Sequence, residues 1–153
     1  MTMPTKAFRI AAIGALIVGA GAYCIGLLNA PMALNEKGYY FAILLMALFS
    51  AVSLQKTIRD KMEGIKTTAI YLLLCWIATG ASIVLLCAGL FNAELLLSEK
   101  GFFGMAFTLS LFSAVTVQKN VRDCAGVADN AEAVPATTAE DSIHSDGELP
   151  CQQ

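Results

Sequence analysis

Residues Gly26–Asp60 read GLLNAPMALNEKGYYFAILLMALFSAVSLQKTIRD, and the pattern returns 63 residues later, where Gly89–Asp123 read GLFNAELLLSEKGFFGMAFTLSLFSAVTVQKNVRD. Of these 35 aligned positions, 17 are identical. Apolar composition alone would not bring Asn-Ala, Glu-Lys-Gly and Gln-Lys-x-x-Arg-Asp back in the same register. The chain is therefore one unit repeated in tandem.

The composition predicts that these repeats lie in a membrane. Hydrophobic residues make up 57% of the 153 residues and charged residues 14%, whereas soluble domains average about 45–50% and about 25%. A helix needs about 20 apolar residues to cross a bilayer, and it satisfies its own backbone hydrogen bonds in lipid. Four stretches without charge are long enough: Ile10–Asn35, Gly38–Gln55, Thr67–Ala93 and Gly101–Gln118. We expect transmembrane helices at about 9–30, 38–56, 68–92 and 101–119.

The repeat sets the expected topology of this all-α membrane protein. Each unit has two helices, so the second unit enters the membrane in the same sense as the first, and the two repeats are parallel. The outward turns are short, which predicts that the two helices of one unit are antiparallel neighbours. We place the first two-helix repeat at 8–60 and the second at 68–123. Residues 124–153 carry six acidic and no basic side chains, and we expect a disordered, acidic cytoplasmic tail.

The distribution of basic residues predicts the orientation. Lys37 and Lys100 are the only basic residues in the two outward turns. The positive-inside rule places the other basic residues, and with them both termini, in the cytoplasm. The formal net charge of −2 gives no basic footprint for nucleic acid. The eight residues on the cytoplasmic side are Lys6, Arg9, Lys56, Arg59, Lys61, Lys66, Lys119 and Arg122.

The first helix has an alternative interpretation as a cleaved signal peptide. Lys6 and Arg9 precede an apolar run, and Ala20-Gly21-Ala22 resembles a cleavage site. The run continues to Ala30, and the helix has a counterpart in the second repeat. These two features favour a retained transmembrane helix.

The polar residues at the outward turns are the first candidate site. Asn35 and Ser98 suit helix N-caps, and the glutamates that follow would favour the helix dipole. The neighbouring lysines can reach the lipid head groups. The alternative is a symmetric pair of polar clusters that binds a ligand or a partner protein. The candidates are Asn29, Glu36, Lys37, Asn92, Glu99 and Lys100.

The second candidate site closes each repeat on the cytoplasmic side. Cations at these helix ends would complement the helix dipole and bind anionic phospholipid head groups. Lys56 and Asp60 are four residues apart, as are Lys119 and Asp123, so each pair can meet along a helix. The alternative to lipid anchoring is recognition of a cytoplasmic partner. The candidates are Gln55, Lys56, Arg59, Asp60, Gln118, Lys119, Arg122 and Asp123.

Over residues 8–123 the sequence resembles the YiaA/YiaB family of bacterial inner-membrane proteins, which are built from a two-helix domain. The resemblance rests on Asn-Ala, Glu-Lys-Gly with two following aromatics, and Gln-Lys with Arg-Asp, each present in both repeats. It implies an inner-membrane location and two copies of the domain. It carries over no established activity.

The expected function is that of a non-enzymatic accessory or organising component, because no ionisable residue lies at membrane depth and no catalytic motif is present. We expect no cofactor and no metal site. The partners would be the lipid bilayer and either a second copy or another membrane protein. Cys24 and Cys87 occupy equivalent positions, and a disulfide between them is left open. The alternative is a small oligomeric transporter or channel lined by Ser50, Ser53, Ser113 and Thr116.

Overall fold

The computed structural model describes residues 3–132, and these residues form four α-helices without a β-strand. The helices are α1 (Lys6–Asn29), α2 (Leu34–Met62), α3 (Ala69–Asn92) and α4 (Leu97–Glu132). Each is long and apolar enough to cross a membrane. The structure therefore confirms the predicted all-α architecture of four membrane helices in two tandem two-helix repeats.

The second and fourth helices are longer than predicted, at both ends. α2 continues past residue 56 and ends before Gly64, whose φ of +79° is a conformation that favours glycine. The equivalent position in the second repeat is Val127, whose β-branched side chain disfavours that conformation. With no glycine to end it, α4 continues to Glu132. The prediction that the disordered tail begins at residue 124 is therefore wrong for 124–132, and residues 133–153 lie outside the described part.

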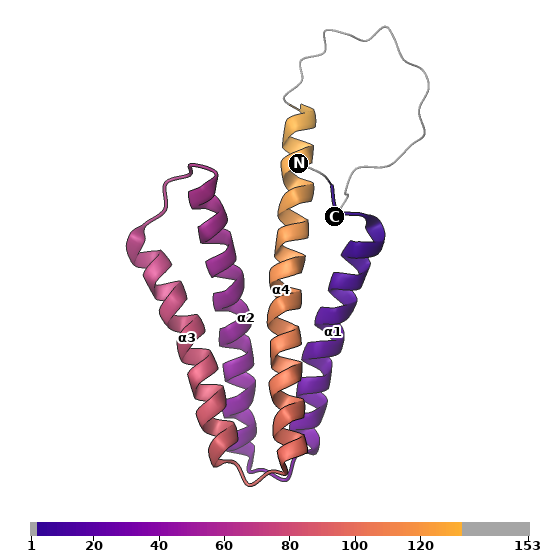
Figure 1. The fold of residues 1–153 in the computed structure, drawn as a ribbon, viewed down its shortest axis with the longest axis vertical. Helices are drawn as coiled ribbons and strands as arrows, with labels where there is room; N and C mark the ends of the chain where they lie inside the picture. Colours follow the sequence, from indigo (N-terminus) through magenta and orange to yellow (C-terminus); the bar gives the residue numbers. More distant parts are fainter. Residues whose placement is uncertain (1–2, 133–153) are drawn as a thin grey trace, which may run out of the picture.

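The helices pair between the repeats rather than within them. α1 packs chiefly against α4 and α2 chiefly against α3, while α2 and α4 contact each other in the centre. Across the view of Figure 1 the helices follow the order α3, α2, α4, α1, with both short turns at one end. The contact between α1 and α2 is much smaller than that between α1 and α4. The expectation that the helices of one unit are close antiparallel neighbours is therefore wrong as a description of the main packing.

Small residues explain why these pairs form. A Cβ atom on Gly19 of α1 would lie 2.9 Å from Ser110 Oγ and 3.0 Å from its backbone nitrogen on α4. The equivalent positions in the α2–α3 pair, Ser82 and Ala47, are also small and have no exposed surface. In lipid, helices associate through such close packing, because lipid is as apolar as the side chains it would replace.

Aromatic side chains fit against two further glycines near the short turns. A Cβ on Gly26 of α1 would lie 2.7 Å from a ring carbon of Phe102, and one on Gly89 of α3 would lie 3.0 Å from a ring carbon of Tyr39. Gly26 and Gly89 are equivalent in the repeat, as are Phe102 and Tyr39. Each aromatic therefore packs on a glycine of the other repeat, which directs the cross-repeat pairing.

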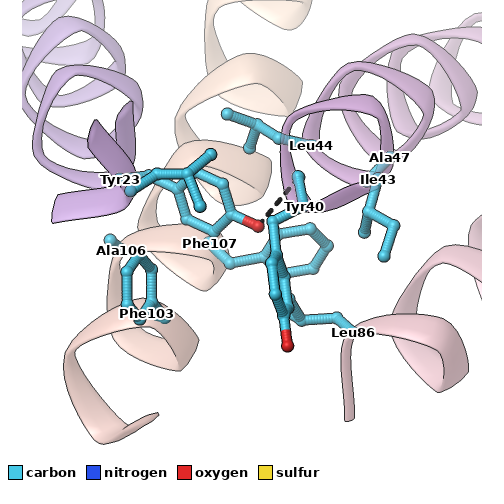
Figure 2. Packing of buried hydrophobic residues seen from close by; sticks show 10 residues of the cluster. Tyr23, Tyr40, Ile43, Leu44, Ala47, Leu86, Phe103, Ala106 and Phe107 are labelled. Carbon is cyan, nitrogen blue, oxygen red and sulfur yellow. Dashed lines mark hydrogen bonds between the residues drawn. The ribbon is translucent and has the colours of Figure 1, made fainter. Parts of the chain in front are cut away.

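The core of the bundle lies between the two helix pairs, near the short turns (Figure 2). Tyr23 has no exposed surface, and its hydroxyl donates a hydrogen bond to the Tyr40 carbonyl at 2.9 Å. The Tyr23 ring meets Phe103 edge to face, with centroids 5.6 Å apart. Tyr40 and Phe103, which are equivalent residues, stack across the centre with centroids 6.5 Å apart. All four helices contribute to this cluster, so it ties both pairs together.

Candidate functional site

The turn end of the bundle, formed by residues 30–33 and 93–96 with the helix ends they join, holds the first candidate residues. Glu36 Oε2 accepts a hydrogen bond from the Ala33 backbone N–H at 3.3 Å, and Glu99 Oε2 accepts one from Leu96 at 3.1 Å. These contacts form half of a capping box at each helix start. The prediction that Asn35 and Ser98 are the N-caps is wrong, because α2 and α4 already begin at Leu34 and Leu97.

The lysines and asparagines of this end close the preceding helices. Lys37 Nζ donates to the Leu28 carbonyl at 2.9 Å, and Lys100 Nζ lies 3.5 Å from the Phe91 carbonyl. These carbonyls are among the last of α1 and α3, which have no partner within the helix. The side-chain amides of the two asparagines also donate within their own helices, Asn29 to Ile25 and Asn92 to Ala88. The six candidate residues thus make the same local contacts twice.

Two cavities at the turn end are related by the repeat. The larger has a volume of about 600 Å³ and lies between α2 and α3, beneath both short turns. The smaller has a volume of about 310 Å³ and lies between α1 and α4. Glu36 and Asn92 line the larger, and their equivalents Glu99 and Asn29 line the smaller. Neither cavity was predicted from the sequence, because both follow from the cross-repeat pairing of the helices.

The ion-pair end, formed by residues 55–62 of α2, its C-cap Glu63 and residues 118–123 of α4, holds the other candidates. The Arg59 guanidinium donates to the Asp123 carboxylate, and the Arg122 guanidinium donates to the Asp60 carboxylate. Each bridge joins α2 to α4, and the two bridges are related by the repeat. Asp123 is 9% exposed and Arg59 17%, so this pair is shielded from water on most sides. The reciprocal bridges tie the central helices together.

Ion pairs within each helix support the bridges. Lys56 lies 3.8 Å from Asp60, and Lys119 lies 3.1 Å from Asp123. The structure thus confirms that both pairs meet along the helix. Gln55 and Gln118 are half-buried, one position before these lysines. The candidates predicted as lipid anchors are therefore brought together, and their arginines and aspartates face each other.

Glu63 is a member of this cluster that sequence reasoning missed. Its carboxylate lies 2.8 Å from Arg122 and 3.4 Å from Arg59. The hydrogen bond from Arg122 lowers the pKa of Glu63, desolvation opposes this shift, and the contact with Arg59 adds to the lowering. The second repeat has Gly126 at the equivalent position. The signal that could have found the bridges is the repeated Arg-Asp pair, since two parallel repeats bring equivalent helix ends together.

One buried side chain at this end is unsatisfied. Asn120 is 3% exposed, and neither polar atom of its amide has a hydrogen-bond partner among residues 3–132. Its equivalent in the first repeat, Thr57, is equally buried and donates to the Ser53 carbonyl at 2.8 Å. A buried polar atom without a partner costs about 1–3 kcal/mol. The second repeat therefore carries an energetic cost that the first does not.

The cysteines at equivalent positions do not pair. Cys24 on α1 and Cys87 on α3 are both free thiols. The two helices are the outer members of the row in Figure 1. The disulfide that the sequence left open is therefore not formed.

Comparison with known proteins identifies the repeat as a recognised domain. The yiaA/B two-helix domain matches residues 8–60 and again residues 71–123. The chain is 60% identical over 119 residues to the inner membrane protein YiaA of Escherichia coli, covering 78% of this chain and 82% of that protein. It is 40% identical over 60 residues to an uncharacterized membrane protein, YubF, of Bacillus subtilis, covering 39% of this chain and 69% of that protein. No solved structure matches the chain.

The matched residues contain most of the four helices, both short turns and both bridges between α2 and α4, and they leave out Glu63 and the last turns of α4. The chain therefore belongs to the YiaA/B two-helix domain family of membrane proteins, with two copies of the domain in tandem.

Proposed function

We propose that this chain is a non-enzymatic accessory or organising component of a membrane complex. The proposal rests on the hydrogen bonds that polar side chains make at membrane depth. Ser82 donates to Ala78 and Ser110 to Ala106, each within its own helix and at 2.7–2.8 Å. The charged groups gather at the two ends instead. Such a bundle presents its charged side chains, which a partner could recognise, at the two membrane faces.

The orientation is part of the proposal. Both termini and the ion-pair end would face the cytoplasm, because eight of the ten basic residues belong to that side of the four helices. The turn end, with Lys37 and Lys100, would face outward. Blocking of single introduced cysteines by a membrane-impermeant thiol reagent, applied to a variant without native cysteines, tests this placement. A cysteine at position 94 should react in intact cells and one at position 66 should not.

The alternative function would need a channel lined by serine and threonine side chains, but the contacts of these side chains favour the accessory role. Ser50 and Ser113 are 3% and 5% exposed, and Ser50 donates to the Ala47 carbonyl. Thr116 donates to the Phe112 carbonyl. Side chains used in this way hold helices together, whereas a transporter or channel would need them to face a continuous aqueous path. We therefore favour the accessory role over conduction.

Two lysines at the ion-pair end are suited to lipid or partner contact. The side chains of Lys56 and Lys119 are 62% and 55% exposed. Anionic head groups attract basic residues at about 1 kcal/mol each near the membrane surface. We propose that these lysines anchor the bundle to anionic phospholipid, while Arg59 and Arg122 serve the bridges.

Gentle affinity capture from native membranes, with quantitative mass spectrometry, tests the proposal. Wild type is compared with Glu36→Gln/Glu99→Gln, which removes charge at the turn end but keeps an acceptor for the caps, and with Lys56→Gln/Lys119→Gln at the other end. Lys61→Gln, which changes an exposed lysine without an ion pair in the described structure, is the matched control.

A stoichiometric membrane protein that is retained by wild type and the control, and reduced in one of the double variants, would support the accessory role and locate its surface. A second copy of this chain as the stoichiometric protein would make the complex a homo-oligomer. Solute flux through purified protein in liposomes, with no stoichiometric partner in membranes, would contradict the proposal.

A further inference from the structure

The larger cavity at the turn end carries an inference that is independent of the accessory role. It is bounded by the start of α2, the end of α3 and both short turns, and its volume is about 600 Å³. Small-molecule sites are typically concave and of about 300–1,000 Å³, with a few convergent polar groups. The side chains that matter for the inference are Glu36, Tyr39, Tyr40, Asn92 and Glu94.

These side chains offer mainly hydrogen-bond acceptors. The Tyr39 hydroxyl already donates to the Leu85 carbonyl at 2.9 Å, and the Asn92 amide nitrogen donates to Ala88. The oxygens of both groups remain able to accept. Glu36 uses one carboxylate oxygen in its cap, and Glu94 makes no ion pair in the described structure. These groups therefore favour an occupant that donates hydrogen bonds.

Among the residues that the structure describes, no basic side chain lines the cavity. The nearest lysines in sequence, Lys37 and Lys100, direct their ammonium groups to the Leu28 and Phe91 carbonyls. The two carboxylates of the cavity are thus left without a cationic partner in its lining. This charge balance favours a positively charged occupant.

Tyr40 supplies the second, independent observation. It is 5% exposed and lines the cavity, yet its hydroxyl has no hydrogen-bond partner among the described residues. A Cβ atom on Gly89 would lie 3.1 Å from this hydroxyl oxygen, so the backbone of α3 closes tightly around it. Figure 2 shows the hydroxyl directed away from the side chain of Tyr23. The side chain is buried as a whole, and its unpartnered hydroxyl lies at the cavity wall, where an occupant could bond to it.

The smaller cavity shows that the fold does not require these groups. There Phe102 and Phe103 stand where the larger cavity has Tyr39 and Tyr40. The residue equivalent to Glu94 is Pro31. The same helix packing thus forms with neither the hydroxyls nor the second carboxylate, which makes them additions specific to one cavity.

We propose that the larger cavity binds an organic ammonium group. Its N–H groups would donate to the carboxylates of Glu36 and Glu94 and to the hydroxyl of Tyr40, and the exposed ring of Tyr39 would offer a cation–π contact. The position of the cavity at one end of the membrane helices suits two sources of this chemistry. One is a free primary amine in the aqueous phase, and the other is the ethanolamine head group of a phospholipid.

The experiment uses full-length protein in maltoside micelles, which carry no ammonium group. Isothermal titration calorimetry with putrescine and with ethanolamine measures the free-amine arm. Native mass spectrometry after mixing with phosphatidylethanolamine, and with its N-acetylated form, measures the lipid arm. The variants are Glu36→Gln/Glu94→Gln and Tyr39→Phe/Tyr40→Phe, with Glu99→Gln in the smaller cavity as the matched control. Circular dichroism verifies that each variant is folded.

We expect the affinity for one of the two sources to fall by about tenfold or more in both double variants and to stay unchanged in Glu99→Gln. Binding of putrescine or ethanolamine with this pattern identifies a free amine. Retention of phosphatidylethanolamine over its N-acetylated form, lost in the same variants, identifies the lipid. Absence of binding in both arms, or equal binding by wild type and the double variants, would overturn the proposal.

Discussion

The two ends of the bundle are held together by different kinds of contact. At the turn end, the polar side chains bond to backbone groups close in sequence, as Glu36 does to Ala33 and Lys37 to Leu28. At the ion-pair end, Arg59 reaches Asp123 and Arg122 reaches Asp60, across more than 60 residues of sequence. The same repeated sequence therefore builds local caps at one end and cross-repeat bridges at the other.

This contrast shows which contacts decide the arrangement of the helices. A cap stabilises its own helix whatever that helix packs against, and it is worth about 0.5–2 kcal/mol. A shielded ion pair constrains two helices to one relative position, and leaving one partner uncompensated costs about 3–5 kcal/mol. Loss of a bridge should therefore destabilise the bundle more than loss of a cap.

The largest effect should follow from breaking one bridge. Arg59→Ala leaves Asp123, which is 9% exposed, with only Lys119 as an ion-pair partner in the described structure. We expect the free energy of unfolding to fall by about 3 kcal/mol, at the lower end for a broken buried pair because Lys119 remains. Titration with SDS in mixed micelles measures it. Lys61→Ala is the control, and an equal loss in both variants would show that the bridge contributes no more than a surface charge.

A smaller effect of opposite sign should follow from repairing the unsatisfied amide. Asn120→Thr copies the residue at the equivalent position, where Thr57 donates to Ser53. We expect the free energy of unfolding to rise by about 1 kcal/mol, because two buried polar atoms without partners are removed.

The reverse change, Thr57→Asn, is the matched partner of this test and should lower stability by a similar amount. The same SDS titration measures both. If Asn120→Thr destabilises the protein, the amide has a partner that is absent from the contacts described here.

At the turn end, loss of a cap should cost less than loss of a bridge. Glu36→Ala removes the acceptor for the Ala33 N–H, and Glu99→Ala removes the equivalent acceptor for Leu96. We expect each to lower stability by about 0.5–1 kcal/mol and the double variant to show the sum, since the two caps lie on separate helices. The glutamine variants should lose less, because an amide oxygen can still accept. A loss as large as that of Arg59→Ala would refute the contrast between the two ends.

The smallest effect should be the pH dependence contributed by Glu63. Because Arg122 lowers the pKa of this carboxylate in the folded protein, its contribution is present above the unfolded pKa and is lost as the pH falls through the folded pKa. The difference in midpoint temperature between wild type and Glu63→Gln should therefore be largest near neutral pH and vanish in acid. Thermal scans at a series of pH values measure it. The same series on Glu94→Gln, whose carboxylate has no ion pair in the described structure, is the control.

The fold was largely predictable from the sequence, and the helix pairing was not. Charge-free runs and the repeat predicted four helices in two units, because lipid admits few alternatives for an apolar segment. The pairing of α1 with α4 depends on which glycine meets which aromatic, as Gly26 meets Phe102. Such shape complementarity between distant residues leaves no periodic signal in one sequence.

The candidate residues divide in the same way. The pairs Lys56–Asp60 and Lys119–Asp123 were predictable, because they depend only on helical spacing. The N-cap of α2 was predicted two residues too late, because Asn35 resembles an N-cap whereas the observed N-cap is Ala33. Glu63 and the larger cavity were missed because the contact of Glu63 with Arg122 and the walls of the cavity both depend on how the two repeats pack together.

The cross-repeat pairing also shows which contacts a single copy of the two-helix domain would lack. One copy has no partner for the contacts that Gly19 makes with Ser110, or that Arg59 makes with Asp123. It could complete them only with a second molecule, and its stability would then depend on protein concentration in the membrane. The segment that joins α2 to α3, residues 63–68, converts that encounter into an intramolecular one with a fixed effective concentration. In this sense the chain is a covalently linked dimer, and it stays assembled at any level of expression.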